Sequence, residues 1–200
     1  RRPVSAARFE VLTMGRVGVD IYPEQVGVGL EDVSSFGKFL GGSPTNVAVA
    51  AARHGRSVAV ITRTGDDPFG RFIHQALRGF GVDDRYVSAV PDLPTPVTFC
   101  EIFPPDHFPL YFYRRPTAPD LQIRADELDL DAVVAADVFW VTGTGLSEEP
   151  SRSATMAALE ARAGRPDRHR GGPRSTVLDL DYRSMFWSSA EEAHKHVSAA

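Results

Sequence analysis

Short, uninterrupted apolar runs constrain the fold of this chain more than any other feature of its sequence. They occur at Phe9–Met14, Val58–Thr62, Val138–Val141 and Thr176–Leu180. Continuous runs of this length, rich in Val and Ile, are typical of parallel strands that are covered on both faces. We therefore expect these segments to be buried strands of one mostly parallel sheet.

Helical segments separate these runs. Pro68–Phe80 has apolar residues at helical spacing, with Asp67 as a candidate N-cap and Pro68 at the first helical position. Asn46–His54 and Ser151–Ala163 are also predicted helices. Strands that alternate with helices predict an α/β fold, in which ligands bind at the carboxyl ends of the strands.

Two segments, Gly18–Leu40 and Pro94–Arg115, interrupt the alternation. In the second, Val97–Phe103 and Leu110–Arg114 have the pattern of strands. We predict that the two segments form a small β lid. The stretch Gly164–Arg174 is rich in Arg, Gly and Pro and predicts a surface loop.

Composition narrows the classes of partner. The chain of 200 residues has a formal net charge of −4 and no concentrated run of Lys or Arg, which argues against nucleic acid or an anionic membrane as partner. Small ligands remain open. The single cysteine, Cys100, fits a reducing cytoplasm and is predicted to be a core thiol, and the absence of a long apolar run predicts a soluble protein.

The segment Leu40–Asn46 carries the most specific chemical pattern. Two glycines lead from a strand end into a helix start, where backbone N–H groups are unpaired and the amide of Asn46 can both donate to and accept from a hydroxyl. A tight turn followed by a helix is the alternative explanation of the same residues.

This pattern and three others resemble the PfkB (ribokinase-like) carbohydrate kinase family. Gly41–Ala48 is similar to the first signature of the family, Gly15–Asp20 to its first strand, and Thr64–Gly70 to the turn after the next strand. Asp179–Trp187 is similar to the D-x-N-x-R-x-x-x-W segment, with Asp181 where Asn is usual. The resemblance implies a ribokinase-like, Rossmann-type α/β sandwich with a mostly parallel central sheet and a small β lid.

The resemblance also implies which residues bind a sugar: Asp20, Gly41, Gly42, Asn46, Phe112, Arg114 and Arg183. Arg114 would pair with a substrate carboxylate from the lid, or would be a solvated lid charge. Arg183 would meet the substrate or the transferring phosphate, or would pair with Asp179 or Asp181. Tyr182, Phe186 and Trp187 are predicted to be local core.

Within the family, residues 104–109 and 179–183 most resemble the kinases of inositol catabolism that phosphorylate 5-dehydro-2-deoxygluconate. The resemblance implies ATP and Mg²⁺ as cofactors, a sugar or sugar acid as the small-molecule partner, and a homodimer formed through the lid strands, for which Val97–Phe103 offers a flat apolar edge. No histidine shows metal-ligand spacing, and no metal site is predicted.

The G-A-G-D segment that supplies the family's catalytic base does not occur in these residues. We therefore expect residues 1–200 to be the N-terminal portion of a single kinase domain, without a catalytic residue of its own and inactive in isolation, with the base beyond Ala200. Two alternatives remain open: a catalytically silent sugar-binding module, or a kinase for ketodeoxygluconate, fructose or a nucleoside.

Overall fold

A parallel sheet forms the centre of the molecule. The computed structural model describes residues 8–163, 168–169 and 172–200. The strands follow the order β11-β8-β1-β4-β5, and every neighbouring pair is parallel. Their bounds are β1 (Val11–Met14), β4 (Val58–Gly65), β5 (Val87–Val90), β8 (Val138–Thr142) and β11 (Ser175–Asp179). The predicted α/β fold with a mostly parallel sheet is confirmed.

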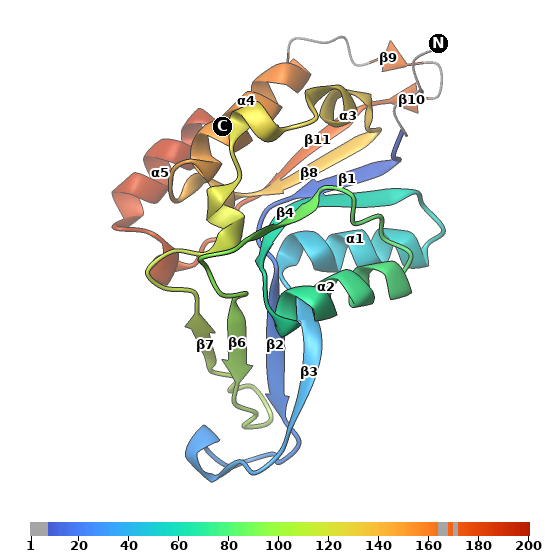
Figure 1. Cartoon of the computed structure of the whole chain (residues 1–200). Coiled ribbons are helices and arrows are strands. Elements are labelled where there is room, and N and C mark those ends of the chain that lie inside the picture. The colour runs from blue at the N-terminus through green and yellow to red at the C-terminus, as the bar shows by residue number, and fades with distance from the viewer. Residues whose placement is uncertain (1–7, 164–167, 170–171) are drawn as a thin grey trace.

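Helices cover both faces of this sheet (Figure 1). Alternate residues of β4 point to opposite sides. Val58 and Val60 pack with residues of α1 (Ser43–Arg53) and α2 (Pro68–Gly79). Ala59 and Ile61 pack with residues of α3 (Leu130–Ala135) and α4 (Ser151–Ala163), while α5 (Ala190–Ala199) packs beside Leu146 and Trp187. A strand buried on both faces needs apolar residues at every position, which explains its uninterrupted run.

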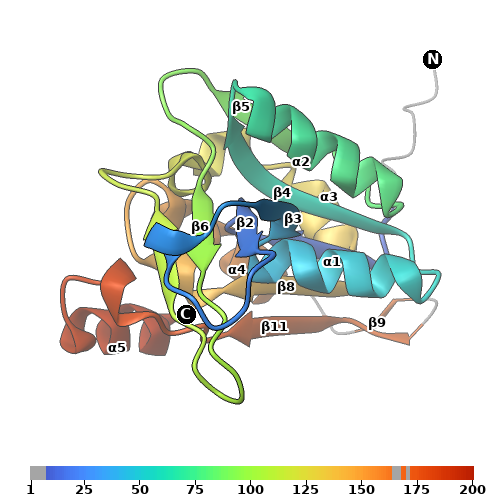
Figure 2. The same ribbon diagram turned by 90° about the horizontal axis from the view of Figure 1, so that it is seen from below.

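A second sheet projects from the first (Figures 1 and 2). Its order is β3-β2-β6-β7, with β2 antiparallel to β3, β2 parallel to β6, and β6 antiparallel to β7. The bounds are β2 (Gly18–Pro23), β3 (Phe36–Gly41), β6 (Val97–Cys100) and β7 (Leu110–Tyr113). We call this the projecting sheet. Its strands come from the two segments that interrupt the alternation, and its action as a lid stays a prediction.

Local signals located the best-defined helix. The Asp67 carboxylate accepts a hydrogen bond of 2.7 Å from the Gly70 N–H, and a proline opens the helix, as predicted for α2. Helix α1 begins at Ser43, earlier than the predicted Asn46. The sequence patterns gave no indication of β5, α3 or α5.

One sequence-based expectation about strands is confirmed and one is wrong. Thr176–Leu180 forms the predicted strand β11, which lies at the edge of the sheet that the described residues form, with Val177 and Leu180 39% and 60% exposed. Val97–Phe103 was expected to be a flat apolar edge, but β6 lies between β2 and β7. The edges of the projecting sheet are therefore β3 and β7.

The predicted loop Gly164–Arg174 is partly replaced by regular structure. Arg168–His169 (β9) pairs antiparallel with Gly172–Pro173 (β10), while residues 164–167 and 170–171 lie outside the described residues. Cys100 is buried and unpaired, which confirms the predicted core thiol. Among the described helices, none is both long enough and apolar enough to cross a membrane.

Candidate functional site

The candidate site lies where the carboxyl ends of three central strands meet the start of α1. Arg16 follows β1, Thr144 follows β8, Asp181 follows β11, and Ser43 opens α1. The side chains of Arg16, Ser43 and Thr144 all contact the carboxylate of Asp181, and we call these four residues the Asp181 group. The carboxyl edge of a parallel sheet is the usual position of ligand sites in this fold class.

Asp181 holds the group together. Its Oδ2 accepts hydrogen bonds from Ser43 Oγ at 2.6 Å and from Arg16 Nη2 at 3.1 Å, and Arg183 Nη2 lies 3.5 Å from its Oδ1. The Asp181 side chain is only 7% exposed, and its backbone has a φ of 34°. A left-handed conformation is uncommon outside glycine, and Asp is among the residues that adopt it most readily.

Two glycines allow close approach in the same region. A Cβ on Gly42, whose φ is 104°, would lie 2.4 Å from the carbonyl oxygen of Arg16. A Cβ on Gly41 would lie 2.2 Å from Oδ1 of Asp20. A side chain at Gly42 would therefore collide with the backbone in a conformation that favours glycine, while one at Gly41 would displace the Asp20 carboxylate.

Asp20 presents a carboxylate without a hydrogen-bond donor. It lies on β2 opposite Phe39 of β3 and Thr98 of β6. Burial raises the pKa of Asp20, and the charge of Arg16 partly opposes this rise. Within the described part of the chain, no group donates a hydrogen bond to this carboxylate, so its oxygens can accept hydrogen bonds from a ligand.

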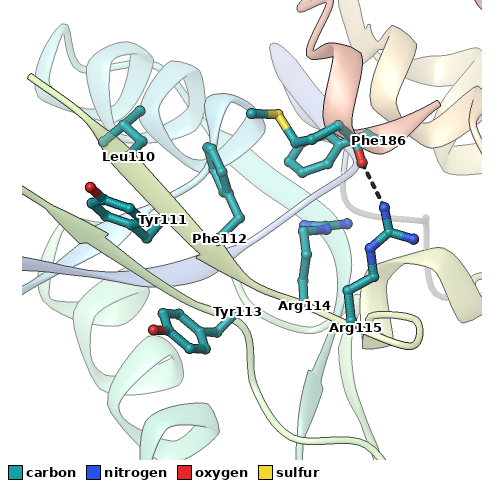
Figure 3. A pocket seen from close by; sticks show the side chains of 8 residues that line it. Leu110, Tyr111, Phe112, Tyr113, Arg114, Arg115 and Phe186 are labelled. Carbon is teal, nitrogen blue, oxygen red and sulfur yellow. Dashed lines mark hydrogen bonds between the residues drawn. The ribbon is translucent and has the colours of Figure 1, made fainter.

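An aromatic contact joins the projecting sheet to the residues after β11. The Phe112 and Phe186 ring centroids are 5.1 Å apart in an edge-to-face arrangement (Figure 3). The guanidinium of Arg16 lies 5.9 Å from each ring centroid, and that of Arg114 lies 4.8 Å from Phe186. Edge-to-face pairs and cation–π contacts of this kind stabilise the packing of β7 against the residues that follow β11.

A pocket opens beside this contact. It has a volume of ≈ 350 Å³ and is lined by residues of β7 and of the turn Ser184–Phe186 (Figure 3): Leu110, Tyr111, Phe112, Tyr113, Arg114, Arg115, Met185 and Phe186. Arg115 Nη2 donates a 2.9 Å hydrogen bond to the Met185 carbonyl oxygen across it. The end of β7 is therefore attached to this turn by a polar as well as an aromatic contact.

Arg114 is buried in an ion pair, which excludes one of its two predicted roles and leaves its contact with a substrate carboxylate a prediction. Its Nη2 lies 2.9 Å from Asp120 Oδ2, and the two side chains are 7% and 2% exposed. The expectation of a solvated lid charge is wrong, because Arg114 is buried and already paired with a carboxylate. Arg183 is 45% exposed and makes the predicted ion pair with Asp181. Its contact with a substrate or phosphate stays a prediction.

The structure brings Asp20, Gly41 and Gly42 together but places Asn46 apart from the Asp181 group. Asn46 is exposed and lines a separate hollow of ≈ 290 Å³ along α1, together with Phe39, Leu40, Val49, Ala50, Arg53 and Phe80. Its predicted sugar contact would have to be made from that side of α1.

Comparison with known proteins agrees with this geometry. Residues 8–199 match the family model described as pfkB family carbohydrate kinase. The chain belongs to this family.

Among curated relatives of this pfkB family member, the 5-dehydro-2-deoxygluconokinase of Clostridium tetani is 34% identical over 193 residues, which are 96% of this chain and 55% of the relative. The 5-dehydro-2-deoxygluconokinase of Shouchella clausii is 34% identical over 186 residues, covering 92% of this chain and 55% of the relative. The chain thus spans about half the length of these relatives.

Solved structures show the same fold. An uncharacterized sugar kinase from Pyrococcus horikoshii superposes with a TM-score of 0.80 at 24% identity, covering 94% of this chain and 61% of its own. That kinase has also been solved with ATP. A putative ribokinase II from Escherichia coli in complex with ATP and Mg²⁺ has a TM-score of 0.78 at 20% identity, with 94% of this chain and 58% of that chain covered. The predicted ribokinase-like fold is confirmed.

The described residues of this pfkB family member do not form a magnesium site. No group of three or more His, Cys, Asp or Glu side chains lies together among them in a way that could hold a metal ion. Carboxylate oxygens are the ligands that Mg²⁺ prefers, and those of Asp181 are already engaged by arginine and serine.

Sequence reasoning missed Arg16, Ser43 and Thr144 and misjudged Tyr182. Asp181 in place of the usual Asn was the one signal that could have indicated an arginine partner. Tyr182 was predicted to be local core but is 50% exposed, because β11 lies at the edge of the sheet. Trp187 is buried as predicted, and Phe186 forms the aromatic contact with Phe112.

Proposed function

We propose that the protein to which this chain belongs transfers a phosphoryl group from ATP to a hydroxyl of a sugar or sugar acid, and that its acceptor is 5-dehydro-2-deoxygluconate. Membership in the pfkB family supports the reaction class. The names of the relatives that are 34% identical support the acceptor. The observation that carries the proposal is the donor-free carboxylate of Asp20 beside two glycines at the start of α1.

The chemistry of Asp20 suits hydroxyl recognition. An ionised carboxylate has two oxygens that only accept hydrogen bonds, so it can bind two neighbouring sugar hydroxyls. Gly41 leaves room for the Asp20 carboxylate beside the start of α1, and Phe112 covers the sugar from the projecting sheet. Fixing the acceptor in this way positions one hydroxyl for transfer, which supplies a large part of the acceleration in such reactions.

ATP would supply the phosphoryl group, and a magnesium ion would neutralise the charge on its phosphates. No residue of this chain is assigned to either, because the described residues offer no set of ligands for the ion. The contribution of this chain is to bind and orient the acceptor and, through the projecting sheet, to exclude water from it.

The test is ATP consumption by the protein produced from its complete gene, with 5-dehydro-2-deoxygluconate, ketodeoxygluconate, fructose and ribose compared side by side. We expect kcat/KM to be highest for the first. Asp20→Asn should lower it by about 10- to 100-fold, because hydrogen bonds to a charged acceptor contribute about 1.5–3 kcal/mol. Asp92→Asn, a change at an exposed acid outside the site, is the matched control. Turnover of none of the four sugars by the folded wild-type protein would refute the proposal.

A further inference from the structure

A sugar acid has a carboxylate as well as hydroxyls, and three arginines lie near enough to the candidate site to bind it: Arg16, Arg114 and Arg183. Guanidinium groups suit this task because they can donate two parallel hydrogen bonds to one carboxylate. The surroundings of the three side chains differ, and these differences decide which arginine is available.

Arg114 is not available. Its partner Asp120 is 2% exposed and lies at 2.9 Å, so a substrate that drew Arg114 away would leave a buried carboxylate without its counter-charge. Removing one member of a buried ion pair costs about 3–5 kcal/mol. Arg183 is 45% exposed and lies 3.5 Å from Asp181, which is the geometry of a weak, solvated pair.

Arg16 is enclosed by the groups that are proposed to bind the sugar. Its side chain is 11% exposed, its carbonyl oxygen faces Gly42, and its guanidinium lies 5.9 Å from the Phe112 ring centroid. Its charge also acts on the Asp20 carboxylate. An anionic group on a sugar held by Asp20 and covered by Phe112 would therefore be close to Arg16.

The hydrogen bonds of Arg16 are incomplete. Nη2 donates to Asp181 at 3.1 Å and lies 3.5 Å from Ser43 Oγ. Nε is buried and has no partner in the described part of the chain. A buried donor without an acceptor costs about 1–3 kcal/mol, so the protein itself does not satisfy all the donors of this guanidinium.

Asp181 fixes the orientation of this guanidinium. Because it accepts from Arg16 and from Ser43 through the same oxygen, it ties the arginine to the first residue of α1. Arg16 and Arg183 carry two positive charges, and Asp181 carries one negative charge. The three side chains together therefore have a net positive charge and do not repel an anion. An Asn at position 181 would accept from Arg16 through a neutral oxygen and would hold its guanidinium less firmly in this orientation.

We propose that Arg16 is the residue that binds the carboxylate of the acceptor, through the guanidinium N–H groups that its contacts with Asp181 and Ser43 leave free, and that Asp181 positions it. This inference rests on the proposed function and assigns a specificity-determining residue within the same site.

The test is calorimetry with the protein produced from its complete gene, in the absence of ATP. It measures the affinity for 5-dehydro-2-deoxygluconate and for the uncharged carboxamide of this acid. Arg16→Gln should weaken binding of the acid by about 10- to 100-fold, at 1.4 kcal/mol for each tenfold. The same change should alter binding of the carboxamide by less than about threefold. Arg16→Lys, which keeps the charge and the Asp181 partner, should recover part of the loss. Asp181→Asn should lower the preference for the acid over the carboxamide. Arg71→Gln, on the exposed side of α2, is the control.

The outcomes separate the two proposals. Equal weakening of both ligands in Arg16→Gln would mean a structural role and would overturn the assignment, as would wild-type affinity for the acid. If Arg16→Gln fails to fold, Arg16→Lys provides a second variant for the same comparison of the two ligands. If the wild-type protein phosphorylates the acid but Arg16→Gln does so equally well, only the Arg16 assignment fails. If the wild-type protein neither binds nor phosphorylates it, the proposed function fails first.

Discussion

At the scale of single residues, Asp20 makes the proposed activity depend on pH. Burial raises its pKa above 3.8, and Arg16 only partly opposes this effect. As pH falls, Asp20 should therefore take up a proton earlier than an ordinary aspartate and lose an acceptor for sugar hydroxyls. We expect kcat/KM to fall on the acid side in the wild-type protein and to be low and flat there in Asp20→Asn, measured as pH–rate profiles.

The raised pKa of Asp20 also makes the stability of the folded protein depend on pH. Since the folded state binds the proton more tightly than the unfolded state, the contribution of Asp20 to stability increases as pH falls between the raised pKa and 3.8. The wild-type protein should gain stability relative to Asp20→Asn over this range in urea titrations. A relative loss would contradict the assigned burial.

Arg114 gives a second prediction at this scale. Arg114→Met should lower the free energy of unfolding by about 3–5 kcal/mol, because it leaves Asp120 buried without a counter-charge. Arg124→Met is the matched control, since the Arg124–Asp126 pair has side chains that are 58% and 69% exposed, and no measurable loss is expected from it. Urea unfolding of both variants makes the comparison. Equal losses in the two would show that Arg114 is not a buried structural partner.

At the scale of elements, Asp67 does more than cap α2. Its carboxylate also accepts hydrogen bonds from the N–H and the hydroxyl of Thr95, at 2.7 and 2.8 Å, which ties α2 to the segment before β6. Burial alone would raise the pKa of Asp67, but hydrogen bonds from Thr95 and Gly70 outweigh it and lower the pKa. Its stabilising contribution is therefore present above the usual aspartate range and is lost as pH falls through the lowered pKa.

Asp67→Ala should destabilise the protein by about 0.5–2 kcal/mol, the range for loss of a helix N-cap. Asp66→Ala, a change at the exposed neighbouring residue, should be close to neutral. Thermal unfolding at neutral pH and again in acid checks the result, because the difference between wild type and Asp67→Ala should shrink in acid. A constant difference would mean that Asp67 acts through packing alone.

Local sequence patterns located the elements well where the cause is local. A cap, a proline and an apolar stripe lie within a few residues of each other, and so α2 was placed correctly. Exposure of β11 and the interior position of β6 depend on which strands become neighbours, and no short stretch of sequence encodes that. The Asp181 group was missed for the same reason, since its members come from separate elements.

At the scale of the whole molecule, the edges of the projecting sheet bear on the predicted homodimer. The outer strand β7 carries Tyr111 and Tyr113, which are 44% and 65% exposed, and Phe36 of β3 is 40% exposed. Exposed apolar edge strands are sites of pairing between chains. We therefore expect the predicted homodimer to form through β3 and β7 and not through the β6 segment.

We expect light scattering of the protein produced from its complete gene to give the mass of a dimer. Tyr113→Lys, which places a charge on the exposed edge, should shift the mass toward a monomer. Leu130→Lys, at an apolar residue of α3 that is 37% exposed, should leave the mass unchanged. A wild-type monomer would refute the prediction, and an equal effect of both changes would place the interface elsewhere.

The hydrogen bonds of Asp181 also set the order in which the site can be assembled. They join this residue to partners 165 and 138 positions earlier in the chain. During synthesis, Asp20 and the glycines leave the ribosome long before Asp181, so a nascent chain that ends before β11 leaves Arg16 and Ser43 without their acceptor. Contacts of such large sequence separation are intrinsically slow to form, because a long loop of chain must first be closed. The acceptor site is therefore completed only when β11 and the residues after it are in place.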